Sequence, residues 1–215
     1  MAEKGQKSPK PKGWRDLKRQ NLPKIVSDID FARKRHLSVA WTNERVGDVL
    51  QTREVLEMHD MSTPDQVDLL RPRIEKCQRV CLDYTGPGVG MGDYLVKEFG
   101  EYDPKAHKNG KIELVTFLQN TKVDLFSKQR MAFEAKLVRV PISRVIREGL
   151  HSVHRVTSNN GGVTYRAPQT EDGHADRCTA HALSVRAGEG DPRETGGYEA
   201  IENMQPEYRR IGGGL

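Results

Sequence analysis

Apolar and polar residues alternate in short runs along the first third of the chain, a pattern typical of strands with one buried face. Three such runs, over residues 24–31, 37–42 and 49–58, follow one another with short polar connections. Consecutive strands with short connections usually pair antiparallel, and Gly47 suits a tight turn between the second run and the third. The pattern therefore predicts a three-stranded antiparallel meander.

Helices and strands alternate after the meander. Ser62 followed by Pro64 is typical of a helix start, and apolar positions with helical spacing continue to about Lys76. The pattern then predicts, in chain order, a strand over 79–85, a glycine-rich turn over 86–92, a helix over 93–99, a strand over 111–117, a helix over 122–139 with a stripe through Phe126, Arg130, Phe133 and Leu137, and a helical stretch from Pro141 to about Gly149. This order predicts an α/β fold whose mixed sheet has three antiparallel strands followed by parallel strands, flanked by helices.

Two further elements complete the predicted domain. Two β-rich runs flank Asn159-Asn160-Gly161-Gly162, which is a strong signal for an added β-hairpin. A last helix is expected over 174–187, and Gly188 ends it.

Segments of low apolar content lie on either side of this domain. Residues 1–23, rich in Lys, Pro and Gly, are predicted to form a disordered arm, and residues 189–215 a flexible tail, which leaves the domain at 24–188. Residues 1–24 carry eight Lys or Arg against two acidic residues, so this segment has a net charge of +6 in a chain of +5. A basic arm on a nearly neutral domain fits a polyanion partner, and it equally fits a solvated tail that only aids solubility.

Several classes of protein are disfavoured by composition. The chain has no run of 18 apolar residues, and its basic start lacks the apolar segment of a secretory signal, so neither a membrane span nor secretion is expected. Its three cysteines, Cys77, Cys81 and Cys178, are an odd number and show no framework spacing, which favours a reducing compartment.

Three aspartates stand where strands end or a helix begins. Asp30 lies inside the first predicted strand, Asp83 ends the fourth strand, and Asp176 lies in the first turn of the last helix. A buried carboxylate is unfavourable unless it is paired or binds a metal. Strand ends meet at one edge of a sheet, so these acids could hold Mg²⁺ or Mn²⁺, and two such ions about 3.5–4 Å apart can hydrolyse a phosphodiester.

Each aspartate also has an ordinary structural explanation. Asp30 could pair with an arginine, Asp83 could cap the next helix, and Asp176 could interact favourably with a helix N-terminus. Asp28 and Asp172 lie close enough in sequence to substitute for Asp30 and Asp176.

Three runs of the sequence resemble the nuclease part of phage large terminase subunits, most closely those of Mu-like phages and prophages. They cover residues 29–41, 81–100 and 173–188, and the resemblance as a whole spans about residues 24–188. It implies a ribonuclease H-like fold, cleavage of concatemeric viral DNA during packaging in the cytoplasm of the bacterial host, and two divalent metal ions. It further implies that the metal ligands are Asp30, Asp83 and Asp176.

Two departures from that family stand out. His36 occupies a position where relatives often carry a second acidic residue, which puts an auxiliary role there in doubt. Members of the family usually begin with an ATPase motor, whose phosphate-binding loop has the pattern G-x-x-x-x-G-K-[ST]. This pattern is not present here, so we expect the nuclease half alone, without ATP hydrolysis. The expected partners are double-stranded DNA, a terminase small subunit, the portal and an ATPase motor domain or subunit.

Basic residues in two places are candidate contacts for the DNA backbone. They are Arg33, Lys34 and Arg35 after the first strand, and His154, Arg155 and Arg166 in the predicted hairpin. Backbone contacts predict weak sequence preference and steep salt dependence. The alternative for residues 33–35 is a solvated turn.

Other functions remain open from the sequence. The glycine run Gly86–Gly92 follows a strand and precedes a helix, as in a nucleotide-binding enzyme, although its spacing is not G-x-G-x-x-G. His174, Cys178 and His181 share one helix face and could bind zinc, but a fourth ligand is not evident. A DNA-binding or packaging assembly protein of the same fold, without catalysis, is the third alternative.

Overall fold

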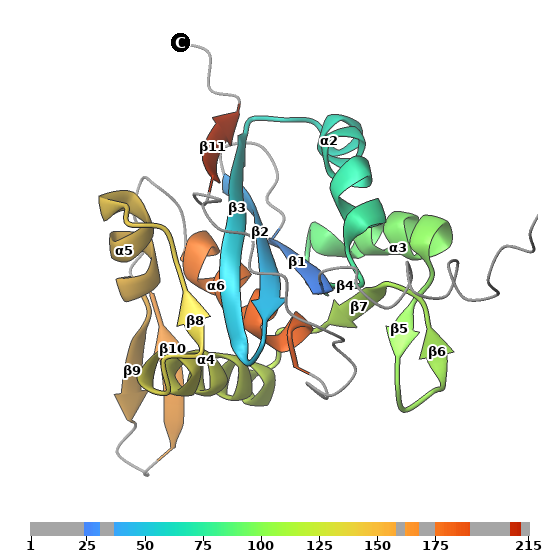
Figure 1. Cartoon of the computed structure of the whole chain (residues 1–215). Coiled ribbons are helices and arrows are strands. Elements are labelled where there is room, and N and C mark those ends of the chain that lie inside the picture. Colours follow the sequence, from blue (N-terminus) through green and yellow to red (C-terminus); the bar gives the residue numbers. More distant parts are fainter. Residues whose placement is uncertain (1–23, 31–36, 158–161, 168–174, 190–206, 212–215) are drawn as a thin grey trace, which may run out of the picture.

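A mixed sheet of seven strands forms the centre of the structure, a computed structural model that describes residues 24–30, 37–157, 162–167, 175–189 and 207–211 (Figure 1). Its strands in spatial order are β11-β3-β2-β1-β4-β7, and β8 pairs with β3 beside this row. The strand bounds are β1 Lys24–Asp30, β2 Leu37–Val46, β3 Val49–His59, β4 Arg79–Asp83, β7 Ile112–Val115, β8 Val138–Arg139 and β11 Glu207–Ile211.

The directions of the strands confirm the predicted mixed sheet. β1, β2 and β3 form an antiparallel meander, and β4 and β7 continue the sheet in parallel with β1. Two small antiparallel pairs lie outside it: β5 (Tyr102–Asp103) with β6 (Lys108–Asn109), and β9 (His154–Thr157) with β10 (Val163–Arg166). The second pair is the predicted hairpin, although residues 158–161 of its turn lie outside the described ranges.

Helices α2 (Thr63–Lys76) and α3 (Gly88–Phe99) cover one face of the sheet (Figure 1). Ser62 caps α2 by accepting a hydrogen bond from the Asp65 amide, and a proline stands in the first turn, as the sequence predicts. The apolar stripe of α2, which includes Leu70 and Ile74, packs against Leu56 and Leu82 of the sheet.

Helices α4 (Gln119–Glu134), α5 (Arg144–His151) and α6 (Asp176–Ala187) lie on the opposite face (Figure 1). α6 lies against β1, β2 and β4, and eight of its 12 residues, all between Cys178 and Ala187, are buried. Its small side chains, such as Ala180 and Ala182, let it approach the sheet closely. α6 is therefore a core helix between the sheet and α4.

Two predicted helices have different limits in the structure. α3 begins at Gly88, inside the segment expected to be a turn, because Gly88 and Gly92 leave room for α3 to lie close to β4 and β7. A Cβ atom on Gly92 would come within 2.9 Å of Tyr84 and Leu114 side-chain atoms. α4 ends at Glu134, and its buried face is Leu125, Phe126 and Gln129, not the stripe through Arg130 and Phe133.

Four strands have no counterpart in the prediction: β5, β6, β11, and β8, which lies where the end of the helix over 122–139 was expected. The β5–β6 pair fills the connection between α3 and β7. β11 is more consequential, because it lies within the segment predicted to be a flexible tail and pairs in parallel with β3 at the edge of the main sheet. The Tyr208 hydroxyl donates a hydrogen bond of 2.9 Å to Glu57 of β3, which fixes this strand to the core.

Among the helices that the structure describes, none is both long enough and apolar enough to cross a bilayer.

The three cysteines are buried thiols that form no disulfide, so we expect none to react with a thiol reagent in the native state. Burial raises the pKa of Cys178 to about 12, which keeps it as an unreactive thiol. Titration with Ellman's reagent should detect no thiols in native protein and three in guanidinium chloride. A rapidly reacting thiol in native protein would contradict this packing.

Candidate metal centre at the carboxyl ends of the central strands

The parallel pairing of β1 and β4 brings two of the predicted acids to neighbouring positions. Ile29 pairs with Leu82, so Asp30 and Asp83, each the last residue of its strand, follow side by side. Adjacent strands are roughly 4.8 Å apart, which is close enough for two carboxylates to share a cation. The register thus confirms that the backbones of Asp30 and Asp83 meet at one sheet edge.

Asp83 is a half-buried acid whose buried Oδ1 has no hydrogen-bond partner within the described part of the chain. Burial raises the pKa of Asp83, and hydrogen bonds from Thr85 only partly offset this effect. The chain turns tightly just after it: a Cβ on Gly88 would lie 1.9 Å from the Asp83 carbonyl oxygen, and Gly86 has a φ of +55°. Asp83 is therefore held at the end of β4 by a tight turn, and one of its carboxylate oxygens accepts no hydrogen bond from the described residues.

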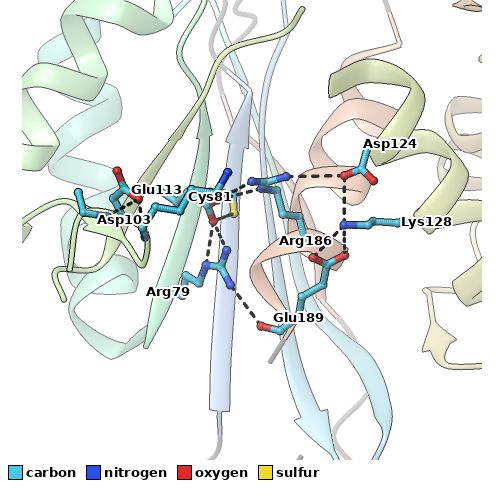
Figure 2. A network of polar contacts seen from close by, with 10 residues as sticks. Arg79, Cys81, Asp103, Glu113, Asp124, Lys128, Arg186 and Glu189 are labelled. Atoms are coloured by element: carbon cyan, nitrogen blue, oxygen red, sulfur yellow. Dashed lines mark hydrogen bonds and ion pairs between the residues drawn. The ribbon is translucent and has the colours of Figure 1, made fainter. Parts of the chain in front are cut away.

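Asp176 is the first residue of α6, and the direction of this helix decides where it lies. At the far end of α6, the Arg186 guanidinium donates to Glu113, which pairs in register with Cys81 of β4 (Figure 2). Arg79, at the start of β4, donates a 3.2 Å hydrogen bond to the Glu189 carbonyl just beyond α6. α6 therefore runs antiparallel to β4, and its first residue lies at the end of the sheet where Asp83 lies.

The carboxylate of Glu113 holds the other end of α6 in place. It accepts hydrogen bonds from both Arg79 and Arg186, and Cys81 Sγ lies 3.1 Å from it (Figure 2). Burial opposes its ionisation, but Arg79, Cys81 and Arg186 together outweigh burial and hold the pKa of Glu113 below its usual value. This network lies at the opposite end of α6 from Asp176, so it aligns the helix and takes no part in the candidate site.

The structure describes only part of the predicted ligand set. Within the described residues, no three His, Cys, Asp or Glu side chains form a group that could hold a metal. Asp83 and Asp176 belong to these residues, whereas only the backbone of Asp30 and Asp28 is described. Residues Arg33, Lys34, Arg35, His36 and Asp172 lie outside the described ranges.

The β9–β10 pair divides the hairpin residues that were predicted to contact DNA. His154 pairs with Arg166, and Arg155 pairs with Tyr165, so the two pairs face opposite sides of the hairpin. All three basic residues are exposed. Arg155 and Tyr165 border a groove of about 820 Å³ with an apolar floor between α4, α5 and the hairpin, which leaves His154 and Arg166 on the outer side.

The alternative sites do not have the form that their chemistry requires. Cys178 and His181 are core residues, and His174 lies outside the described part of the chain. His181 lies between the rings of Trp41 and Phe133, and its Nδ1 is 2.8 Å from the Gln129 amide nitrogen. Five of the seven residues of the Gly86–Gly92 run belong to the first turns of α3, where Gly88 and Gly92 pack closely against Asp83, Tyr84 and Leu114.

Burial lowers the pKa of His181 to about 3, which gives protein stability a defined pH dependence. The unfolded chain binds a proton near pH 6.5 and the folded chain does not, so stability is full above pH 6.5 and declines towards pH 3. In thermal melts from pH 8 to pH 5, His181→Phe should lack the loss of stability that protonation of His181 causes. The difference in melting temperature between His181→Phe and the unsubstituted protein should therefore shrink as pH falls. His151→Gln, at an exposed histidine, should keep the unsubstituted slope, and a constant deficit for His181→Phe would refute the explanation.

The fold is that of phage large terminase nuclease domains. The nuclease of the large terminase from thermophilic phage G20c, solved with bound magnesium, superposes with a TM-score of 0.59 at 20% identity, over 76% of this chain and 81% of that one. The large terminase nuclease domain of Thermus phage P74-26 gives 0.56 at 18% identity, over 75% and 78%. The G20c nuclease has also been solved with bound cobalt and with bound zinc. These likenesses establish the ribonuclease H-like fold that the sequence predicts.

Neither the protein-family models nor the curated proteins include a match to this chain.

Proposed function

We propose that this chain is a divalent-metal-dependent endonuclease that cuts double-stranded DNA during phage genome packaging. The observation that carries the proposal is Asp83, a half-buried acid beside the last residue of β1, with a buried oxygen that lacks a hydrogen-bond partner among the described residues. Burial of a carboxylate in this way is unfavourable unless a cation or proton compensates it. The shared fold with large terminase nucleases supports DNA as the substrate.

Asp30, Asp83 and Asp176 are the residues proposed to hold the metal, with two Mg²⁺ or Mn²⁺ ions as the cofactor. Their oxygen donors suit these hard cations, and a bound cation would offset the effect of burial, which raises the pKa of Asp83. Solved G20c nucleases with bound magnesium, cobalt and zinc support a divalent ion at such a site. When bound, the ions supply an activated water and stabilise the departing oxygen of the phosphodiester.

The protein's own groups orient the substrate in this proposal. Arg33, Lys34, Arg35, His154 and Arg166 are proposed to contact backbone phosphates, with Arg155 at the border of the groove. Such contacts carry no sequence information, so cleavage should show weak sequence preference and should weaken steeply with salt.

The proposed biological setting follows from the fold. The substrate would be concatemeric phage DNA in the cytoplasm of the bacterial host, and the partners a terminase small subunit, the portal and an ATPase motor. The sequence contains no phosphate-binding loop of the motor type, so the motor is proposed to act on this domain from another chain or another part of the protein.

Digestion of a supercoiled plasmid tests the proposal. We expect nicked and linear products with Mg²⁺ or Mn²⁺, and no products with EDTA or without added metal. Binding of the plasmid without cleavage in any divalent ion would favour the non-catalytic DNA-binding alternative. Cleavage that persists in EDTA would contradict the metal-dependent mechanism.

A further inference from the structure

A buried charged cluster joins the C-terminal strand β11 to the first turn of α6. At its centre is Glu57 of β3, whose side chain is 0% exposed. The Arg177 guanidinium donates to both Glu57 oxygens, from Nε to Oε1 and from Nη2 to Oε2 at 3.0 Å. The Tyr208 hydroxyl of β11 donates to Oε2 at 2.9 Å.

The cluster lies in the same transverse row of the sheet as the candidate metal site. Glu57 pairs with Val39, and Val39 pairs with Asp30, so Glu57 is two strands away from the Asp30 backbone. Two strand spacings are roughly 10 Å. Arg177 directly follows Asp176, so its bond to Glu57 fixes the end of α6 that carries this acid.

Among the described residues, the N-cap of α6 makes no side-chain hydrogen bond to the helix start. This residue, Ala175, has a left-handed backbone with φ of 63°, which is unfavourable for a residue with a Cβ. The stem of Arg177 instead passes over Gly149 in the last turn of α5, where a Cβ would lie 2.7 Å from the Arg177 Cδ. The two hydrogen bonds from the Arg177 guanidinium to the Glu57 carboxylate therefore help to fix the direction of the first turn.

We propose that Glu57, Arg177 and Tyr208 are positioning residues for Asp176, and that docking of β11 thereby sets the affinity of the metal site. The inference rests on the proposed function, because it takes Asp176 to be a ligand. Tyr208 orients the Glu57 carboxylate, Glu57 orients Arg177, and Arg177 fixes the helical turn that presents Asp176. Outer partners of this kind strengthen metal binding by holding ligands in their binding geometry.

Tyr208→Phe is the most selective test, because it removes one hydroxyl and keeps the ring that packs in the core. We expect its dissociation constant for Mn²⁺, measured on the full chain by electron paramagnetic resonance of free Mn²⁺ at 20 °C, to rise roughly 3–10-fold. The Mg²⁺ concentration for half-maximal plasmid nicking should rise by a similar factor, and the rate at saturating Mg²⁺ should change little.

Gly149→Ala disturbs Arg177 from the other side and leaves β11 intact, so it should weaken Mn²⁺ binding as well. Tyr94→Phe removes a hydroxyl on the exposed side of α3 and serves as the matched control with an unchanged dissociation constant. A thermal melt of each variant separates loss of folded protein from loss of affinity, because a purely structural role would lower the melting temperature without changing Mn²⁺ binding at 20 °C.

Two results separate a failure of the positioning role from a failure of the proposed nuclease function. An unchanged dissociation constant in folded Tyr208→Phe overturns the inference alone and leaves the nuclease proposal standing. Absence of Mn²⁺ binding and of nicking by the unsubstituted chain overturns both.

Discussion

Asp83→Asn is expected to reduce metal-dependent plasmid cleavage by more than about 100-fold, since loss of an outer partner alone typically lowers activity or metal affinity about 10–100-fold. The amide nearly preserves the shape of the side chain but removes the negative charge that a divalent ion requires. Initial nicking rates at saturating Mg²⁺ give the comparison. Asp68→Asn, on the exposed side of α2, is the matched control and should cut at the unsubstituted rate.

The same variant should be at least as stable as the unsubstituted protein when metal is absent. Because burial raises the pKa of Asp83, the folded state loses stability as pH rises from the ordinary value of 3.8 through the raised pKa, and this loss persists at neutral pH. Asparagine has no such loss, so its melting temperature in EDTA should be equal or higher. At saturating Mg²⁺ the unsubstituted protein should have the higher melting temperature, because only the protein with an intact site gains stability from binding the ion. Normal cleavage by Asp83→Asn would refute the site assignment.

Glu113→Gln should give the largest loss of stability of any single change considered for this chain. It leaves the Arg79 and Arg186 guanidinium groups, both largely buried, without their shared negative partner. Breaking a buried ion pair from one side typically lowers the free energy of unfolding by about 3–5 kcal/mol, and partial exposure of the two arginines reduces this to about 2–4 kcal/mol. For a domain of this size, the melting temperature should fall by roughly 5–15 °C.

Acid should remove the difference in stability between Glu113→Gln and the unsubstituted protein. The pKa of Glu113 is lowered in the folded state, so its contribution is full above the ordinary value of 4.5 and is lost as pH falls through the lowered pKa. Glu134→Gln breaks an exposed ion pair with Arg130 and should leave the melting temperature nearly unchanged. A melting temperature of Glu113→Gln equal to that of Glu134→Gln would show that the network contributes little.

Local signals were sufficient to predict most of the sheet and several helices. Ser62 and Pro64 mark the start of α2 because capping and a fixed proline φ act within one turn. The alternation of the first three runs predicts the meander because each strand pairs with its neighbour in sequence. The start of α3 was wrong because glycine disfavours helices locally, whereas close packing against Tyr84 and Leu114 requires glycine there.

The candidate site was predicted less completely, for a related physical reason. Asp83 and Asp176 stand at a strand end and a helix start, positions that the sequence itself reveals. The partners that hold α6 come from distant segments: Arg177 and Glu57 are 120 positions apart, and Arg186 and Glu113 are 73 apart. The only local signal was a charged residue within an apolar strand, as at Glu57 between Leu56 and Met58.

The parallel pairing of β11 with β3 has a consequence for the order of folding. Tyr208 and Glu57 are 151 positions apart, so this contact closes a very long loop, and contacts of such separation form late because of the chain entropy lost. Until then, β3 presents unpaired amide and carbonyl groups along part of one side, which is a template for association with other chains. Newly made protein should therefore be most prone to aggregate in the interval before β11 pairs with β3.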